Sequence, residues 1–553
     1  MVTVEAEAQK KLSHHKLDNT DSAEINPEGS KRNKKKKPKK KDAPQVDPYY
    51  EHALGKYPVS LRSTKTKGRH AVAMNDLNEG ITVCLERATA FVVRTDYMDQ
   101  QCHVCLKTLT TKLMCSDCRK AYYCSKTCLE QDDLHTLVCS TLAQVHTIGR
   151  STDTDPDLLS LMTLLLARRA RENEKESNTT DNFGPTPFWC INDLISHREK
   201  ASGDFIRVLT EASQRLLSEM PESMHLPVED MVTLACRINA NAHGLGDSLA
   251  RNTDVALGLF PVGAMFFNHA CNPNCSFVGL PDGQLAFRTI RPVRRDEELT
   301  VSYIDLYAPR DERRIDLLQS KHFWCKCKRC TTPMNASVDR LLHGVLCTQC
   351  KKDVYVIPPA SMEEIVQGQK KTDNKWQCAG CEHVANPESV RQILEQAQSS
   401  YTSGMTAIRR ERNYRRARQN LEPLAKLTTS NLHPQNAVRL NACIPLMNCL
   451  RHENDLKGAV DINKTIIDLL ENYANQQLPR NTPEISDFWQ NLGELCNALA
   501  GQYQAASRTA LEKRWRKDAR DAFAEAAKVR SVVYGPEHPK TKLVASHVSD
   551  DQM

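Results

Sequence analysis

The segment from Asn268 to Cys275 reads Asn-His-Ala-Cys-Asn-Pro-Asn-Cys, a run of small and polar residues that carries a thiol. Its central proline excludes a helix interior or a central strand, so we expect a loop. Further along the chain, three thiols stand at ligand spacing: Cys325, Cys327 and Cys330. With Cys271 they make a four-sulfur set typical of structural zinc, which would tie this tail to the loop. In the alternative reading, Cys271 is a buried apolar thiol and the other three form a surface cluster.

Eight more soft ligands lie in one earlier stretch: Cys102, Cys105, Cys115, Cys118, Cys124, Cys128, His135 and Cys139. Eight ligands fill two tetrahedral zinc sites. We expect the pairing to be interleaved. One ion then takes Cys102, Cys105, Cys124 and Cys128, and the other takes Cys115, Cys118, His135 and Cys139. Both ions would be coordinatively full, so neither could activate water.

A third pattern, Cys347-x2-Cys350 followed by Cys378-x2-Cys381, indicates a zinc ribbon with a structural role. The remaining cysteines are expected to be small core residues: Cys84, Cys190, Cys236, Cys275, Cys443, Cys449 and Cys496. Because metal spacing dominates, the pattern favours a reducing compartment over disulfide bonds. A cysteine nucleophile would need a paired base, and none is evident.

The chain has 553 residues and a net charge of +7, so we expect several domains. Nine positive charges fall between Lys31 and Lys41, and without them the remainder carries about −2. The basic balance therefore belongs to a tail, which is either a nuclear import signal or a solvated segment. No apolar run follows the start Met, and the longest, Leu158 to Ala167, is too short to span a bilayer.

The chain alternates between strand-like and helical patterns. Residues 59–93 and 230–305 are predicted to form short strands, and residues 157–217 to be helical. From about residue 388 helical periodicity takes over. There Trp489-x2-Leu492-Gly493-x2-Cys496, followed by Ala522, Phe523, Ala526 and Ala527, approaches a tetratricopeptide (TPR) repeat. An ordinary helical bundle is the alternative.

This order resembles the SET and MYND domain (SMYD) lysine methyltransferases, whose finger also carries aromatic residues like Tyr122-Tyr123 before Cys124. The resemblance implies an α+β protein: a β-rich SET fold interrupted by a MYND zinc finger, a zinc-bound post-SET tail and an all-helical TPR-like C-terminal domain. The expected parts are a disordered Lys-rich tail (1–48), the first SET part (55–101), the MYND insert (102–139), a helical insert (140–230), the second SET part (231–310), the post-SET and ribbon region (311–385) and the helical domain (388–553).

The resemblance also implies site residues. S-adenosylmethionine would contact Lys67, Gly68, Arg69, Asn241, Asn268, His269, Tyr303 and Phe323. Tyr303 is the expected catalytic residue, next to the transferred methyl group. A lysine amine with a pKa of ~10.4 must lose its proton before it can attack. An apolar channel beside a cationic donor favours that loss, and alignment would supply most of the acceleration.

Three positions depart from the family pattern. His70 stands where a second glycine is usual and could crowd the donor. Ala270 replaces a serine, which is a smaller change. Lys321 replaces an aromatic residue of the lysine channel, a wall that Trp324 or Tyr307 could supply instead.

We therefore predict a protein-lysine N-methyltransferase that acts on histone or non-histone lysines and uses S-adenosylmethionine, with structural zinc: two ions in the finger, one after the SET part and one in the ribbon. The alternative is a catalytically weak or inactive SET scaffold that recruits partners through the finger and the helical array. A nucleic-acid-binding zinc protein is disfavoured, because the part outside the tail is not basic.

Expected partners are a substrate with a target lysine, bound between the SET core and the C-terminal helices, and proline-containing peptides at the finger. We expect a monomer in nucleus and cytoplasm, with no membrane partner.

Overall fold

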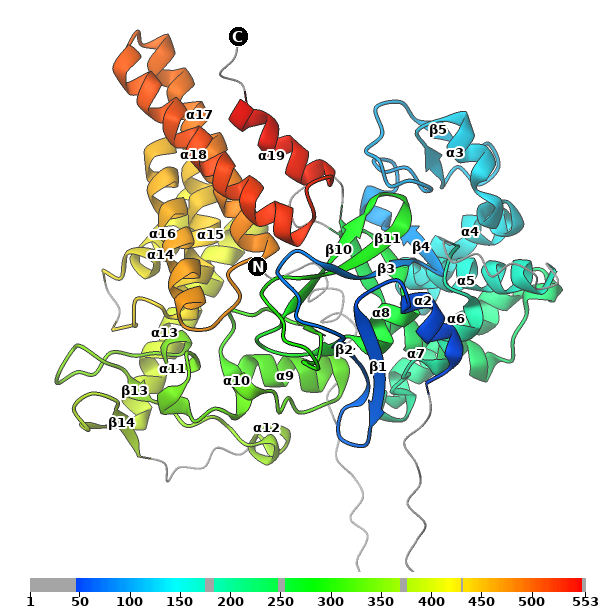
Figure 1. Ribbon diagram of the computed structural model, residues 1–553, viewed down its shortest axis with the longest axis horizontal. Coiled ribbons are helices and arrows are strands. Elements are labelled where there is room, and N and C mark those ends of the chain that lie inside the picture. Colours follow the sequence, from blue (N-terminus) through cyan, green and yellow to red (C-terminus); the bar gives the residue numbers. More distant parts are fainter. Residues whose placement is uncertain (1–45, 175–183, 247–253, 369–374, 429–430, 550–553) are drawn as a thin grey trace, which may run out of the picture.

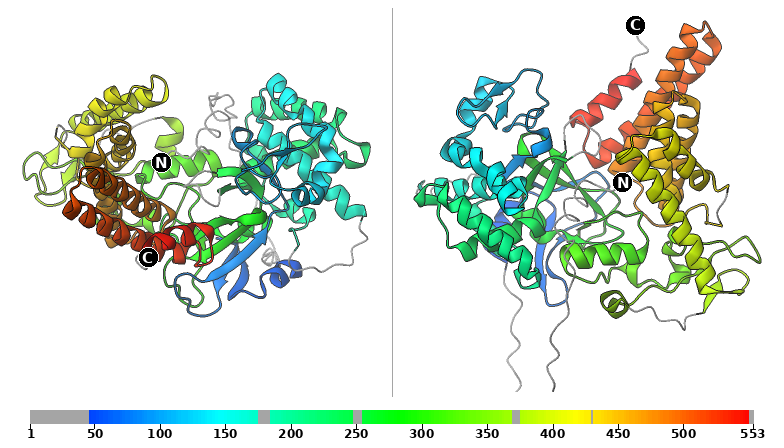
Figure 2. Two further views of the ribbon diagram at one scale, coloured as in Figure 1. Left: turned by 90° about the horizontal axis from the view of Figure 1, so that it is seen from above. Right: turned by 180° about the vertical axis from the view of Figure 1, so that it is seen from behind.

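A computed structural model describes residues 46–174, 184–246, 254–368, 375–428 and 431–549. Short strands occupy the centre of the molecule, with the Cys-rich finger and its neighbouring helices on one side and the C-terminal helices on the other (Figure 1). The view from above shows the same separation (Figure 2). The predicted α+β architecture is thus confirmed. Of the predicted tail, only residues 46–48 are described, and there Asp47 caps α2 (Pro48–Leu54).

The central strands form small sheets. The hairpin β1 (Val59–Thr64) with β2 (Gly68–Ala73) is antiparallel. A second sheet has the order β10 (Cys275–Leu280), β11 (Gln284–Thr289), β3 (Thr82–Arg87), and a third the order β4 (Ala90–Val93), β8 (Asp254–Leu259), β7 (His243–Gly246). Two-residue strands β9 (Asn268–His269) and β12 (Thr300–Val301) pair in parallel. The strands predicted within residues 59–93 lie in β1 to β4.

The prediction of strands from residue 230 onward was wrong at its start, where α7 (Val228–Asn241) is a helix. Its buried residues include Met231, Leu234, Ala235 and Ile238, which share one face at helical spacing. Glu229 and Asp230 lie in the first turn, where negative charge complements the helix dipole. These start signals, rather than the apolar content, distinguish the helix from a strand.

The predicted helix over residues 157–217 is divided. Its ends lie in α5 (Pro156–Glu174) and α6 (Gly203–Ser218). Between them lie the 3-10 turns η2 (Phe188–Asp193) and η3 (Arg198–Lys200), because Pro185 and Pro187 oppose a continuous helix. The turn η4 (Glu222–Met224) connects α6 to α7, and α8 (Pro261–Phe266) follows β8.

The Cys-rich finger has little regular structure. It contains β5 (Leu113–Met114), β6 (Tyr122–Tyr123) and α3 (Lys126–Gln131), preceded by η1 (Thr95–Tyr97) and followed by α4 (Asp133–Thr152). Tyr123 is fully buried against the thiols of the finger. Such a small core needs a further constraint to be stable, and metal binding supplies one.

The tail after Tyr303 consists of short elements. They are α9 (Arg310–Lys321), α10 (Lys328–Thr331), η6 (Met334–Ala336), α11 (Asp339–Leu342) and α12 (Met362–Gln367), with the ribbon strands β13 (Tyr355–Val356), β14 (Trp376–Cys378) and β15 (Val384–Ala385). The turn η5 (Pro281–Gly283) joins β10 to β11.

The C-terminal part is helical throughout its described residues, as predicted. Its helices are α13 (Pro387–Arg409), α14 (Tyr414–Lys426), α15 (Ala437–His452), α16 (Leu456–Asn475), α17 (Pro483–Ala505), α18 (Thr509–Val533) and α19 (Pro539–Ser549). The predicted close approach of small residues occurs between α17 and α18, where a side chain at Gly493 would collide with the Phe523 ring. Arg288 of β11 joins this array to the central strands by donating to the Val532 carbonyl at 3.0 Å. No helix among the described residues has the length and apolar character needed to cross a membrane.

Candidate active site and metal centres

The predicted loop at residues 268–275 begins with β9, which pairs in parallel with β12, the strand that leads to Tyr303. Asn268 pairs with Thr300 and His269 with Val301, and the Ala270 amide donates to the Val301 carbonyl at 2.9 Å. Asn274 is buried, and its side chain fixes the position of the segment that precedes Tyr303. Its amide donates to the Glu298 carbonyl and its oxygen accepts from the Thr300 amide, both at 2.8 Å. The chain therefore places Asn268, His269 and Tyr303 in one small volume.

Tyr303 is held at both ends. Its hydroxyl donates to the Phe267 carbonyl at 2.9 Å, and its amide donates to His269 Nδ1 at 3.1 Å. Burial, with a smaller effect of Glu298, raises the pKa of the phenol well above its ordinary value, so the hydroxyl is neutral near pH 7. Burial lowers the pKa of His269 to about 3, which keeps the imidazole neutral.

The expected donor loop lies directly against Asn268. The Asn268 amide donates to the carbonyls of Lys67 at 3.2 Å and Arg69 at 3.3 Å. Gly68 has a φ of +68°, and a Cβ there would have no heavy atom within 4 Å. The backbone at Gly68 is thus open to a ligand, and we take this as a fit to S-adenosylmethionine. The His70 side chain is buried and its Nδ1 lies 3.0 Å from the Gly68 carbonyl oxygen, within its own hairpin.

Phe323 lies beside His269, whereas the Asn241 amide bonds to a carbonyl of its own helix and to one outside it. The Phe323 ring centroid is 6.1 Å from that of His269, which is 5.4 Å from that of Tyr303. Asn241 ends α7, where its amide donates to the Ile195 and Arg237 carbonyls at 2.8 Å. The end of α7 reaches the tail through Lys321, whose Nζ donates to the Ala240 carbonyl at 2.9 Å.

Lys321 also reaches Tyr303, since its Nζ lies 5.8 Å from the centroid of the Tyr303 ring. The two aromatic residues proposed to replace the missing wall make other contacts. Tyr307 packs 5.7 Å from the Tyr473 ring of the helical array, and the Arg314 guanidinium covers Trp324 at 4.6 Å. The charged end of Lys321 thus lies beside the Tyr303 ring.

His243, the first residue of β7, was not predicted as a site residue. Its ring lies 5.0 Å from that of Phe277, and its buried Nδ1 has no hydrogen-bond partner among the described residues. Burial, helped by the charge of Lys321, lowers its pKa to about 4. The only sequence signal was its position two residues after Asn241.

The ligand atoms gather in the four predicted sets, including the interleaved pairs of the finger, and in each set they lie within 4.8 Å of one another. A tetrahedral zinc with Zn–S bonds of ~2.3 Å has sulfurs about 3.8 Å apart. The sulfur–sulfur distances fit this value: 3.6 Å for Cys105–Cys124, 3.7 Å for Cys115–Cys139, 3.5 Å for Cys271–Cys330 and 3.7 Å for Cys347–Cys381. All four sets could therefore hold zinc with no open position.

The set of Cys271, Cys325, Cys327 and Cys330, here the Cys271 group, has a charged neighbourhood that suits zinc. Arg310, Arg313 and Arg329 converge on the fully buried Asp339 at 3.1, 2.9 and 2.8 Å. Three guanidinium groups and one carboxylate leave a net charge of two positives, whereas Zn²⁺ with four thiolates carries two negatives. The net charges of the two buried clusters therefore offset each other.

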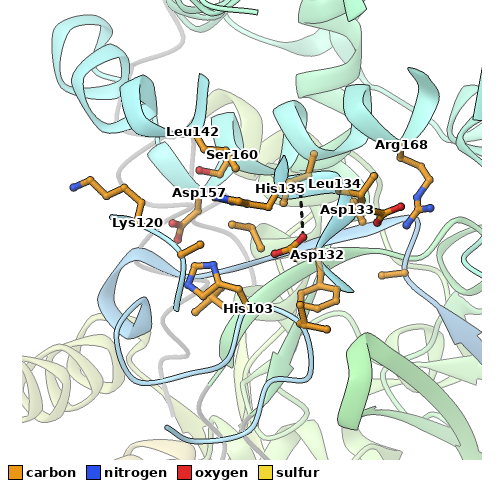
Figure 3. Close-up of a pocket in the computed structure, with 18 of the residues that line it drawn as sticks. His103, Lys120, Asp132, Asp133, Leu134, His135, Leu142, Asp157, Ser160 and Arg168 are labelled. Atoms are coloured by element: carbon orange, nitrogen blue, oxygen red, sulfur yellow. Dashed lines mark hydrogen bonds between the residues drawn. The ribbon is translucent and has the colours of Figure 1, made fainter. Parts of the chain in front are cut away.

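A separate cavity of about 490 Å³ lies between the finger, β4 and α5. Figure 3 shows His103 and Lys120 of the finger on one side and Ser160 and Arg168 of α5 on the other. The Arg168 guanidinium donates to the Thr89 carbonyl at 3.1 Å at one end of the cavity. Tyr303 does not line this cavity, which is thus distinct from the expected methyl-transfer site.

Comparison with known proteins identifies the class. The sequence matches the SET domain family over residues 68–304. Histone-lysine N-methyltransferase ASHR1 of Arabidopsis thaliana is 26% identical over 306 residues, which cover 53% of this chain and 60% of that protein. Histone-lysine N-methyltransferase SMYD3 of Mus musculus is 26% identical over 277 residues, 50% of this chain and 61% of the relative. N-lysine methyltransferase SMYD2 of Homo sapiens is 22% identical over 480 residues, 86% of this chain and 94% of the relative.

The SET-domain match contains an eight-ligand finger and is followed by a tail whose three thiols join Cys271, which is the arrangement of a SET-domain protein with an inserted metal-binding module. With these relatives, that arrangement makes the chain similar to the SET and MYND domain proteins.

Proposed function

We propose that this chain is an S-adenosylmethionine-dependent protein-lysine N-methyltransferase that acts on histone or non-histone lysines. The observation that carries the proposal is the convergence of the loop around Gly68, the Asn268-His269 pair and Tyr303 at one crossing of the chain. Supporting it, two relatives are named histone-lysine and one N-lysine methyltransferase.

In this proposal the expected donor contacts are Lys67, Gly68, Arg69, Asn241, Asn268, His269, Tyr303 and Phe323. When bound, S-adenosylmethionine supplies a methyl group on a sulfonium centre. The acceptor amine first loses a proton to solvent. The neutral amine would then take the methyl group that the bound donor supplies. Tyr303 positions the amine, because its donor bond to Phe267 leaves the oxygen lone pairs free to accept.

We propose structural zinc in all four ligand sets, with two ions in the finger, one in the Cys271 group and one in the ribbon. The Cys271 group shapes the site directly, since Tyr303 and Phe323 pack against it. Zinc there would hold the tail as a wall of the donor site.

We further propose a monomer in nucleus and cytoplasm, with the substrate peptide bound between the SET core and the C-terminal helices. Proline-containing peptides would dock at the finger, where the cavity beside β4 offers a recess. The predicted nuclear signal lies outside the described residues. No membrane partner is proposed.

A second function, an adaptor with a weak or inactive SET scaffold, is favoured by one observation: the Lys321 ammonium lies beside the Tyr303 ring. Two variants separate the functions in cells. Under the enzyme proposal Tyr303→Phe abolishes the cellular function, and under the adaptor proposal Cys124→Ala abolishes it while Tyr303→Phe does not.

The direct test is incubation of the purified full chain with radiolabelled donor and a panel of histone and non-histone lysine substrates, beside calorimetry with S-adenosylhomocysteine. We expect label on a substrate lysine and binding of one S-adenosylhomocysteine per chain. Absence of binding would rule the enzyme out.

A further inference from the structure

A lysine belonging to the chain itself lies beside Tyr303, the residue expected to position the acceptor amine. Lys321 is the last residue of α9, and its Nζ is fixed by the 2.9 Å bond to the Ala240 carbonyl at the end of α7. The same Nζ lies 5.8 Å from the centroid of the Tyr303 ring. Because Tyr303 is anchored through Phe267 and His269, both partners of this contact are held in place.

Several titratable groups surround this ammonium. Alongside burial, the charge of Lys321 contributes to lowering the pKa of His243 on β7, and to a lesser degree those of His197 and His322. Lys200 adds a second positive charge by donating to the His322 carbonyl at 3.1 Å, while Glu199 opposes it. The carboxylate of Glu298 also influences Tyr303, and it pairs with Lys67 at 2.7 Å. Burial keeps His243 neutral, so the charges near the Lys321 ammonium are those of Lys200 and Glu199.

We infer that Lys321 is a specificity-determining residue, which selects the neutral amine of a target lysine over the ammonium. It also selects the cofactor product, whose thioether sulfur is neutral, over the donor, whose sulfonium is cationic. The inference rests on the proposed methyltransferase function. A positive charge beside the bound amine disfavours its protonated form, as neighbouring cations do for other reactive lysines. The same charge opposes entry of the target as an ammonium ion. Lys321 therefore eases deprotonation of the bound amine and weakens capture of the target.

The size of the effect follows from Coulomb's law. Two unit charges about 6 Å apart, at an effective dielectric constant of about 20, oppose each other by a factor on the order of 100. Salt and solvent reduce this, so we expect changes of about tenfold, or about one pKa unit.

Two variants at Lys321 separate charge from length. Lys321→Met removes the charge and keeps an unbranched chain, and Lys321→Arg keeps the charge. Lys513→Met, at an exposed position on α18, is the matched control. The first readout needs no turnover: calorimetry gives the ratio of the affinities for S-adenosylmethionine and S-adenosylhomocysteine. We expect Lys321→Met to raise this ratio about tenfold in favour of the cationic donor, and Lys321→Arg and Lys513→Met to leave it unchanged.

The second readout is the pH profile of methyl transfer to a lysine peptide. In Lys321→Met, KM should fall about tenfold near pH 7, and the pH of half-maximal kcat should rise by about one unit. Superimposable profiles and equal affinity ratios in the wild type and Lys321→Met would overturn the inference, although the enzyme assignment would survive. Failure of the wild type to bind S-adenosylhomocysteine would rule out both the enzyme assignment and the inference about Lys321.

Discussion

The Arg313 guanidinium lies 3.8 Å from the sulfur of Cys330 while it also binds both carboxylate oxygens of Asp339, at 2.9 and 3.0 Å. One side chain therefore joins the Cys271 group to the buried charge cluster of the tail. Burial alone would raise the pKa of Asp339, but the guanidinium groups of Arg329 and Arg313 outweigh it and hold the pKa well below its ordinary value. The carboxylate is thus charged across the physiological range.

Asp339→Ala should be strongly destabilising. The change leaves Arg310, Arg313 and Arg329 buried without their shared anion, and breaking a buried pair typically costs about 3–5 kcal/mol. Chemical denaturation of the full chain measures the loss in the free energy of unfolding. Asp296→Asn is the control, because it removes the exposed charge that pairs with Arg62, keeps a residue type that tolerates the left-handed backbone at this position, and should change stability by less than about 1 kcal/mol. Equal effects of the two substitutions would show that the cluster does not stabilise the tail.

Zinc content should follow the ligand sets. Elemental analysis of the tag-free chain is expected to find four zinc ions per molecule, and three in Cys271→Ser. The same variant should lose S-adenosylhomocysteine binding, since Phe323 would no longer be held against the site. Cys449→Ala, at a buried thiol outside all four sets, should keep the full zinc content. A Cys271→Ser protein that retains every ion would refute the assignment of this group.

Tyr303→Phe should separate catalysis from binding. The substitution removes only the hydroxyl that donates to Phe267, so the fold and donor binding should persist with at most about 1 kcal/mol lost. The amine would lose its positioning partner, and misplacement of reacting atoms costs on the order of 100-fold in rate. Single-turnover transfer from labelled donor, beside calorimetry with S-adenosylhomocysteine, measures both quantities. Unchanged turnover would exclude Tyr303 from the reaction.

The ligand sets could be predicted from the sequence because metal spacing is local. In the Cys271 group, Cys325, Cys327 and Cys330 lie within six residues, and only Cys271 had to be added from a distance. The charge cluster on Asp339 could not be predicted, because its three arginines come from two helices whose docking creates the contact. Lys321 could be predicted only in part. The sequence shows that the position is not aromatic, but the direction of the side chain depends on how α9 ends against α7.

The helix α7 was missed although its start signals were present, because its apolar residues alone fit a buried strand as well as a helix. His243 was missed for a different reason. A histidine at a strand start has no distinctive spacing, and only the fold surrounds it with Phe260, Phe277 and Phe287.

Glu86 should make stability depend on pH in an unusual direction. The side chain is buried and accepts from the amides of Val262 at 3.0 Å and Gly263 at 2.7 Å and from the Thr186 hydroxyl at 2.8 Å. Burial nevertheless dominates and raises its pKa to about 7. Because the folded protein holds this proton more tightly than the unfolded chain, the contribution of Glu86 is fully present below about pH 4.5 and is lost as the pH rises towards 7.

Glu86→Gln, which cannot ionise, tests this dependence. The stability of the wild type relative to Glu86→Gln should fall by about 2–3 kcal/mol between pH 4.5 and pH 7.5, measured as the difference in the free energy of unfolding at each pH. Glu174→Gln, at an exposed carboxylate that ends α5, is the control and should show no such difference. A difference between wild type and Glu86→Gln that stays constant over this range would mean that the amides of Val262 and Gly263 outweigh burial and keep Glu86 ionised throughout.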